Sequence, residues 1–368
     1  MIETQPIPVP DDVPPQVSTP GRKNLLIALI VLILLLGITL FVAGKFPSRT
    51  ATSTTALQKM AGITSPTPVP FAEMTIPYLR SKTYESSLGE RQLYQDNGAY
   101  TSYLTSYMSS GLKVNGLLTI PSGEQPKDGW PAIVFIHGYI PPTLYATTEK
   151  YIAYVDYLAR NGFVVFKIDL RGHGQSEGSP GGGYFGSDYV TDALNAYSAL
   201  ENADFVNKSA IGMWGHSMAG NTILRSMAVR PEIPAGVIWA GAVYTYEDQR
   251  KFGINDQSYR PPGTISQNSS RRRELFEKHG SPSASHPFWQ QVAPTNYLND
   301  LKGAISINHA EDDDVVDIGY SRDLMALLDE TKVPHEFYTY PTGGHNIEGP
   351  SFTSAIERTA DFFKKYLQ

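Results

Sequence analysis

The chain has 368 residues, of which 41% are hydrophobic and 18% are charged, and its formal net charge is −6. This composition is typical of a globular protein with one large or two average domains, and its acidic balance favours no nucleic-acid partner. The chain contains no cysteine, which excludes disulfides, thiolate metal sites and a cysteine nucleophile.

The amino-terminal part of the chain predicts three segments before the folded domain. Residues 1–23 are proline-rich and predict a short disordered tail. Residues 24–44 include the uncharged run LLIALIVLILLLGITLFVAG, and about 20 apolar helical residues are enough to cross the hydrocarbon core of a bilayer. We therefore expect one transmembrane helix at 24–44, with the lipid bilayer as its partner. Residues 45–74 are rich in threonine, serine and proline and predict a linker.

Two other interpretations of the apolar run are weaker. A buried core helix is rarely apolar on all sides over this length, and a cleaved signal peptide has a shorter apolar region of about 7–15 residues. The orientation of the helix is open, because Arg22 and Lys23 precede the run and Lys45 and Arg49 follow it. The lack of cysteine favours an extracytoplasmic position for the large domain.

From residue 75 to residue 368, short apolar runs alternate with helical patterns. Continuous apolar runs of this length predict strands that are buried on both faces, as in a parallel sheet. The predicted strands are 116–120, 132–138, 163–174, 210–217, 236–243, 304–310 and 335–341. The predicted helices are 149–162, 187–202 and 351–367. The alternation predicts an α/β fold with a mostly parallel central sheet and helices on both faces.

Local signals mark the ends of these helices. Gly162 stands where a helix is expected to stop, and Ser187 and Ser351 are expected to cap the amino-terminal ends of the two later helices. The basic run RRRELFEK at 271–278 predicts the solvated face of a further helix rather than a nucleic-acid site.

The stretch IGMWGHSMAGN, residues 211–221, nearly matches the G-x-S-x-G turn that presents a serine nucleophile between a strand and a helix. Gly215 provides the first small residue, Ala219 replaces the second glycine, and Gly220 follows directly. One methyl group is a mild departure from the pattern. We therefore expect Ser217 to be the nucleophile, with an ordinary serine in a tight turn as the alternative.

A serine nucleophile needs a base, and the chain has eight histidines. His345, in the glycine-rich segment YPTGGHNIEG between the last predicted strand and helix, is the best candidate. Four other histidines follow strands and are expected to hold loops together, namely His137, His173, His216 and His309. The remaining three are expected at the surface, namely His279, His286 and His335.

The base in turn needs a carboxylate, and the segment INHAEDDDVVD supplies Asp312, Asp313 and Asp314 after a strand. An oxyanion hole needs backbone N–H groups, which we expect from Met218, directly after the nucleophile, and from Tyr139, after the strand that ends in His-Gly. No cluster accompanies His137, so we expect no metal, and nothing indicates a cofactor.

These segments together resemble the α/β-hydrolase superfamily over about residues 100–368. The resemblance is carried, in chain order, by FIHGY, DLRGHGQSEG, GHSMAG, HAEDDDVV and YPTGGH. It points to the prolyl-oligopeptidase-like and serine-aminopeptidase-like branches, which include many esterases. It implies an α/β-hydrolase fold for 75–368, preceded by the single transmembrane helix.

In these branches the acid commonly lies four residues after the histidine of an H-G-x-x-D-x-x-V motif. This spacing from His309 selects Asp313 as the acid of a triad with Ser217 and His345. Ala310 replaces the motif glycine here, so Asp312 and Asp314 stay open. The resemblance implies that no cofactor is needed.

The activity implied is hydrolysis of a carboxylic ester or a related acyl bond through an acyl-enzyme. A serine peptidase acting on small peptides is the main alternative. Acyl transfer to an acceptor other than water, and a non-catalytic binding protein on the same fold, are the others. Residues 244–300 predict an insertion that is either an aromatic lid over the site or a helical segment packed at the edge of the domain. If it is a lid, Arg271–Arg273 could attract acidic substrates. The oligomeric state is not predicted.

Overall fold

The computed structural model describes residues 69–255, 257 and 264–368, with the backbone alone for 264–269. The chain divides into the units Met1–Thr67 and Pro68–Gln368, and only the second is described. The predicted tail at 1–23, the transmembrane helix at 24–44 and nearly all of the linker at 45–74 lie outside the described residues. Within the described part of the chain, none of the helices combines the length and the apolar character that a membrane span requires.

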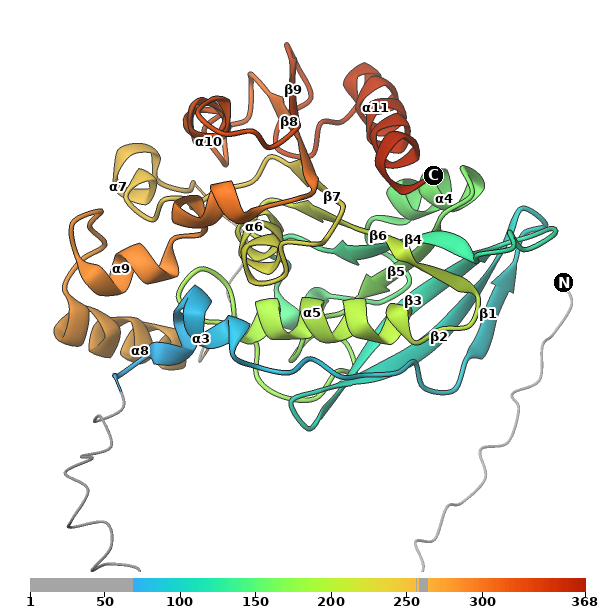
Figure 1. The fold of residues 1–368 in the computed structure, drawn as a ribbon, viewed down its shortest axis with the longest axis horizontal. Coiled ribbons are helices and arrows are strands. Elements are labelled where there is room, and N and C mark those ends of the chain that lie inside the picture. Colours follow the sequence, from blue (N-terminus) through green and yellow to red (C-terminus); the bar gives the residue numbers. More distant parts are fainter. Residues whose placement is uncertain (1–68, 256, 258–263) are drawn as a thin grey trace, which may run out of the picture. The chain divides into compact units, whose positions relative to one another are not determined.

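A sheet of nine strands forms the centre of the described unit, in the order β1-β2-β3-β5-β4-β6-β7-β8-β9 (Figure 1). The strands are β1 (Gln92–Asp96), β2 (Tyr100–Ser109), β3 (Leu112–Pro121), β4 (Trp130–Ile136), β5 (Val164–Ile168), β6 (Val206–His216), β7 (Ala235–Trp239), β8 (Ala304–Ala310) and β9 (His335–Tyr340). From β5 to β9 every neighbouring pair is parallel, whereas β1, β2, β3 and β5 pair antiparallel.

The parallel strands are those that the apolar runs predict. Side chains along β5, β7 and β8 are buried throughout, and those of β4 are buried after Trp130, because helices cover both faces of the sheet. The predicted strand 163–174 is too long, since β5 ends at Ile168 and the following DLRGHG forms a turn. The predicted mostly parallel α/β sheet is confirmed.

Two strands were not predicted. β1 and β2 form an antiparallel hairpin at one edge of the sheet, and β1 is exposed along its whole length. The sequence YTSYLTSYMS of β2 alternates between buried and less buried residues, so it lacks the continuous apolar run on which the prediction relied. A strand that is covered on one face needs apolar side chains only on that face.

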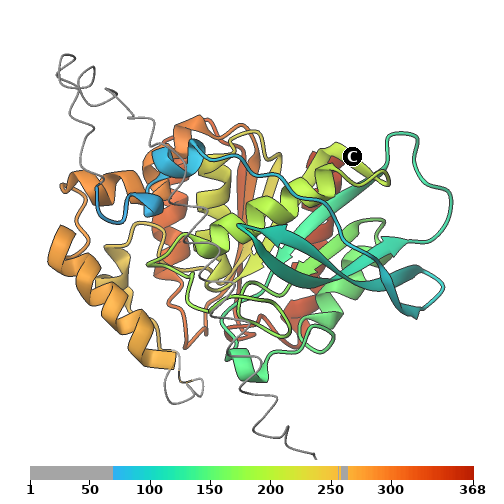
Figure 2. The same cartoon turned by 90° about the horizontal axis from the view of Figure 1, so that it is seen from below.

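Helices lie on both faces of the sheet. α4 (Ile152–Arg160) and α11 (Pro350–Leu367) contribute to one core cluster, and α5 (Asp188–Glu201), α6 (Ala219–Val229) and α10 (Gly319–Asp329) contribute to the other. Between β7 and β8 lie α7 (Asp248–Phe252), α8 (Thr264–His279), α9 (Pro287–Val292) and the 3-10 helix η3 (Pro294–Asp300). α8 and the β1–β2 hairpin lie at opposite ends of the described unit (Figure 2).

The folded unit begins before the predicted boundary at residue 75. The 3-10 helix η1 (Ala72–Met74) and the helix α3 (Ile76–Arg80) pack into the core, with Met74 and Ile76 fully buried. The main-chain oxygen of Met74 accepts a hydrogen bond of 2.7 Å from the buried guanidinium of Arg225. The predicted linker is therefore too long at its carboxyl end.

The predicted helix ends are partly wrong. Ser187 stands at the N-cap position of α5, but its hydroxyl makes no capping hydrogen bond. Ser351 lies inside the first turn of α11, whose N-cap is Gly349 and whose first residue is Pro350. The Ser351 hydroxyl instead donates to the carbonyl of Thr342, at 2.5 Å. Proline at the first helical position supplies the start signal that was attributed to the serine.

Candidate active site

Ser217 lies in the turn between β6 and α6, at the carboxyl edge of the parallel strands. Its φ is 55°, a left-handed conformation that is costly for a residue with a side chain. The turn is held by two hydrogen bonds, from Ser217 N–H to the carbonyl of Trp239 at 2.8 Å and from Gly220 N–H to the carbonyl of Ser217 at 2.9 Å. The strained serine at a strand-to-helix turn is the geometry that presents a nucleophile above a sheet.

The glycines around Ser217 explain why alanine is tolerated at 219. A Cβ atom on Gly215 would lie 2.7 Å from the Ala219 Cβ, so the alanine methyl fills the space that Gly215 leaves empty. A Cβ on Gly220 would lie 2.8 Å from the Ile238 side chain. Close approach of helix and strand is thus achieved by Gly215 and Gly220, and the turn keeps its geometry without a glycine at 219.

The carboxylate of Asp313 meets the imidazole of His345 in the loops after β8 and β9. Nδ1 of His345 donates to Oδ2 of Asp313 at 2.9 Å. The Asp313 side chain is fully buried, whereas that of His345 is 17% exposed. His345 therefore has one nitrogen committed to a buried carboxylate, which leaves the other nitrogen as the one that faces a reacting group.

Asp313 is held as an anion by four hydrogen bonds. Its second oxygen, Oδ1, accepts from the main-chain N–H groups of Val315 and Val316, each at 2.9 Å. His309 Nε2 lies 3.1 Å from Oδ2. Burial opposes ionisation, but the hydrogen bonds from His309 and His345 outweigh it and keep the pKa of Asp313 well below its usual range.

The two neighbouring aspartates make different contacts. The carboxylate of Asp312 accepts from the N–H groups of Gly343 at 3.2 Å and Gly344 at 2.8 Å, so it supports the loop that carries His345. Asp314 is exposed, and its main-chain oxygen accepts from the Asn255 side chain at 3.1 Å. Of the three predicted alternatives, only Asp313 contacts the histidine.

The four histidines expected to hold loops together are buried and bonded to main chain or side chains. His309 joins Ser321 at 2.7 Å and Asp313, and His216 joins Tyr151 and the carbonyl of His345, each at 2.8 Å. Nε2 of His137 lies 2.9 Å from the carbonyl of Asp169. Burial lowers the pKa of His137 to about 3, so this histidine is neutral.

The residues predicted for the oxyanion hole lie on either side of the turn. Met218 is the N-cap of α6, so its N–H points out of the first turn of the helix and has no intrahelical acceptor. Tyr139 follows β4 and is half-buried. No hydrogen bond joins the Ser217 hydroxyl to another described residue. Such contacts often tighten only when substrate binds.

Within the described ranges, no group of histidine and acidic side chains has the arrangement of a metal site. The predicted site residues come from four loops, which follow β4, β6, β8 and β9. The arrangement comprises a strained serine, a carboxylate-bound imidazole and a helix amino terminus, which together suit nucleophilic attack on a carbonyl group.

Described residues of the insertion at 244–300 pack into the core of the domain. Tyr244, Tyr246 and Trp289 are buried, and the Tyr246 and Trp289 rings lie 5.6 Å apart. Its link to the site is the glycine-rich loop 180–186. The Tyr246 hydroxyl donates to the carbonyl of Tyr184 at 2.7 Å, and a Cβ on Gly183 would lie 3.1 Å from the Met218 sulfur.

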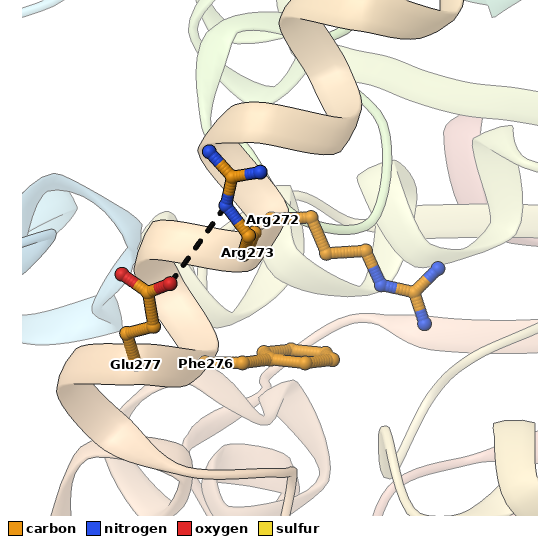
Figure 3. Close-up of a pocket in the computed structure, with 4 residues that line it drawn as sticks. All are labelled: Arg272, Arg273, Phe276 and Glu277. Carbon is orange, nitrogen blue, oxygen red and sulfur yellow. Dashed lines mark ion pairs between the residues drawn. The ribbon is translucent and has the colours of Figure 1, made fainter.

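An open cavity of about 500 Å³ lies along α8 and is lined by Arg272, Arg273, Phe276 and Glu277 (Figure 3). Arg273 pairs with Glu277 at 3.7 Å. Arg272 stacks on two rings, at 4.6 Å from the centre of Phe185 and 5.2 Å from that of Phe276. The predicted helix at 271–278 is confirmed as part of α8, and its basic side chains are exposed.

Two contributors to the site were missed by the sequence reasoning. The first is Tyr151, at the start of α4, whose hydroxyl contacts Gly138 beneath the site. The second is the loop 180–186, which packs against Met218. A tyrosine in an amphipathic helix carries no sign of such a role. The run SPGGGYFGS is a clearer signal, because glycines cluster where backbone must approach another element closely.

Comparison with known proteins finds similarity to one family model and to a bacterial relative. Residues 130–259 match the family model described as "Serine aminopeptidase, S33". The chain is 26% identical over 247 residues to a Bacillus subtilis protein described as "Uncharacterized peptidase YtmA", a match that covers 66% of this chain and 85% of the relative.

Solved structures share the fold at lower identity. An acetyl xylan esterase from Paenibacillus sp. R4 is 18% identical, with a TM-score of 0.57, and the match covers 79% of this chain and 92% of the esterase. A puromycin-hydrolysing peptidase of Mycobacterium tuberculosis is 19% identical, with a TM-score of 0.56, and the match covers 74% of this chain but 40% of the peptidase. The fold is therefore common to esterases and to the hydrolase part of a larger peptidase.

Proposed function

We propose that the chain is a serine hydrolase of the α/β-hydrolase superfamily that cleaves carboxylic esters through Ser217, His345 and Asp313. The observation that carries the proposal is the 2.9 Å contact between Nδ1 of His345 and the buried carboxylate of Asp313. This contact fixes the tautomer in which Nε2 of His345 is free to accept the serine proton.

The reaction follows from these positions. Ser217 Oγ attacks the carbonyl carbon while His345 Nε2 takes the hydroxyl proton, and Asp313 stabilises the imidazolium. The N–H groups of Met218 and Tyr139 stabilise the oxyanion. His345 then passes the proton to the departing alkoxide. Water, deprotonated by the same nitrogen, attacks the acyl-enzyme and releases the acid and Ser217. The residues require no cofactor for this chemistry.

The preference for esters rests on the extent of the matches. The esterase fold is matched over 92% of its chain, whereas the peptidase is matched over 40%. The match therefore takes in nearly all of the esterase but less than half of the peptidase. The family match and the Bacillus subtilis relative support the alternative, a serine peptidase acting on small peptides.

The first test is covalent labelling of the full-length chain with a fluorophosphonate, followed by peptide mass spectrometry. We expect an adduct on Ser217 that is absent from Ser217→Ala and strongly slowed in His345→Ala. Parallel assays with p-nitrophenyl acetate and aminoacyl p-nitroanilides then compare esters with amides. Faster turnover of amides would reject the ester preference while leaving the triad intact.

Failure of wild-type protein with native circular dichroism to label would reject catalysis by Ser217. It would favour the other class of function, a binding protein on this fold. Label accompanied by acyl transfer to an added alcohol or amine, in preference to water, would instead indicate an acyltransferase. Product analysis by mass spectrometry distinguishes transfer from hydrolysis.

We also propose that residues 24–44 anchor the enzyme in a membrane with its hydrolase domain outside the cytoplasm. The uncharged run of 24–44 supports the anchor, and the absence of cysteine supports the location. Full-length protein should stay in the membrane pellet after carbonate extraction. External protease should digest the domain in intact spheroplasts, and protection from it would reverse the proposed orientation.

A further inference from the structure

A chain of hydrogen bonds runs beneath the site and joins three of its loops. The N–H of Gly138, after β4, lies 3.1 Å from the Tyr151 hydroxyl. That hydroxyl lies 2.8 Å from Nδ1 of His216, the residue before the nucleophile. Nε2 of His216 lies 2.8 Å from the main-chain oxygen of His345.

Donors and acceptors in this chain have one consistent assignment. An amide N–H only donates, so Tyr151 oxygen accepts from Gly138 and its own proton goes to Nδ1 of His216. A carbonyl oxygen only accepts, so Nε2 of His216 carries the proton that it donates to His345. The Tyr151 hydroxyl therefore selects the tautomer of His216 that can hold the base loop.

Packing leaves this arrangement little freedom. His216 and Gly138 are buried, and a Cβ on Gly138 would lie 2.9 Å from Nδ1 of His216 and 3.0 Å from the Tyr151 oxygen. The Tyr151 ring packs edge-on against Phe135, with 5.6 Å between ring centres. Only glycine at 138 allows the three groups to meet.

The charge state of His216 suits a position beside the base. Its ring centre lies 4.5 Å from that of His345. Burial, followed by the proximity of His345, lowers the pKa of His216 to about 3, so His216 is neutral near pH 7. A neutral neighbour does not oppose the positive charge that His345 gains during the reaction.

We propose that Tyr151 and His216 are positioning residues that hold the loops of the base and of the oxyanion hole against the nucleophile turn. The proposal rests on the function proposed above. His345 is then fixed at two points, its imidazole by Asp313 and its main chain by His216. The Gly138 N–H, after β4, is used by Tyr151.

The central test is Tyr151→Phe in the full-length chain, assayed with p-nitrophenyl acetate. The substitution keeps the ring and removes the hydroxyl, so both tautomers of His216 become accessible and the base loop loosens. We expect kcat to fall about tenfold with KM changed less than about twofold, since a misplaced base affects the transition state rather than binding.

The matched control is Tyr157→Phe in the same helix, because the Tyr157 hydroxyl bonds to no described residue. Its kcat should equal that of wild type. A second pair examines the histidine. Glutamine can place a donor near Nε2 and asparagine cannot, so His216→Gln should retain several-fold more kcat than His216→Asn. The proposal would be overturned if Tyr151→Phe kept the wild-type kcat or lost no more activity than Tyr157→Phe. Equal activity of His216→Gln and His216→Asn would also overturn it.

A readout independent of catalysis separates this proposal from the function. The ¹⁵N signals of selectively labelled histidines report which nitrogen carries the proton. His216 should carry it on Nε2 in wild type, and Tyr151→Phe should show a mixture of the two neutral tautomers. A proton on Nδ1 of His216 in wild type would overturn the proposed chain of hydrogen bonds even if Ser217 is labelled normally. Absence of Ser217 labelling with the expected tautomer would reject the function alone.

Discussion

At the scale of single residues, the site depends on where small side chains stand around Ser217. The methyl of Ala219 occupies the space in front of Gly215. Glycine is therefore required at 215 and 220 rather than at 219, where the G-x-S-x-G pattern has it. The strained φ of Ser217 is kept by hydrogen bonds to Trp239 and Gly220. The turn therefore depends jointly on the small residues at positions 215, 219 and 220.

The first prediction concerns the packing between positions 215 and 219. Gly215→Ala should destabilise the protein by about 1–3 kcal/mol, as overpacking of a filled core does, because the new methyl meets Ala219. Ala219→Gly should recover part of the loss in the double variant and change activity little by itself. Urea unfolding of the four proteins gives the coupling energy, and strict additivity would contradict the explanation.

The second prediction distinguishes the neighbouring aspartates. Asp313→Asn should lower kcat by about 10³–10⁴-fold, because His345 loses the carboxylate that sets its tautomer. Asp312→Asn removes only a support of the Gly343–Gly344 backbone and should cost less than about tenfold. Comparable losses in both variants would show that the acid has been assigned to the wrong residue.

Acid titration provides a third prediction for the same carboxylate. The folded-state pKa of Asp313 is depressed, so its contribution to stability is present above the unfolded value of about 3.9 and is lost as pH falls through the folded value. The difference in unfolding free energy between wild type and Asp313→Asn should therefore shrink below about pH 4. A difference that is constant from pH 7 to pH 3 would contradict the depressed pKa.

At the scale of elements, the sequence predicts well where burial is complete and poorly where it is partial. The apolar runs of β4, β6, β7 and β8 are sufficient to place these parallel strands, and with them the loops that carry Ser217, after β6, and Asp313, after β8. The hairpin β1–β2 was missed because one exposed face interrupts the pattern. Tyr151 was missed because its partner His216 is 65 residues away in the chain.

One strand of the sheet contains a buried cation that yields a fourth prediction. Lys167 of β5 donates to the carbonyls of Thr147 at 2.5 Å and Lys150 at 2.9 Å. Burial lowers the pKa of Lys167 to about 8. The unfolded chain then binds more protons between about pH 8 and pH 10.5, so wild type should gain stability over Lys167→Met in this window. Parallel stability curves would contradict the lowered pKa.

At the scale of the whole molecule, the insertion between β7 and β8 packs against the loop 180–186, which lies beside Met218. Of its three adjacent arginines, Arg271 pairs with Glu73 at 2.7 Å and Arg273 pairs with Glu277. Arg272 pairs with none of the described carboxylates and stacks on Phe185, in the loop that packs on Met218. This contact relates the insertion to the oxyanion side of the site.

A fifth prediction follows for charged substrates. Arg272→Gln should raise KM about two- to fivefold for a p-nitrophenyl ester with a free carboxylate on its acyl chain and leave KM for p-nitrophenyl acetate unchanged. Arg273→Gln, which removes an already paired charge, is the matched control. Equal effects of both variants, or an equal effect on both esters, would show that the cavity along α8 takes no part in substrate choice.

The separation of the site residues along the chain also has a consequence for biosynthesis. His345, the proposed base, follows His216 by 129 residues. A ribosome adding about 5–20 residues each second needs roughly 6–26 seconds to make that stretch. During this interval the emerging polypeptide has the serine turn but lacks Asp313 or His345, so the proposed triad stays incomplete until synthesis has passed residue 345.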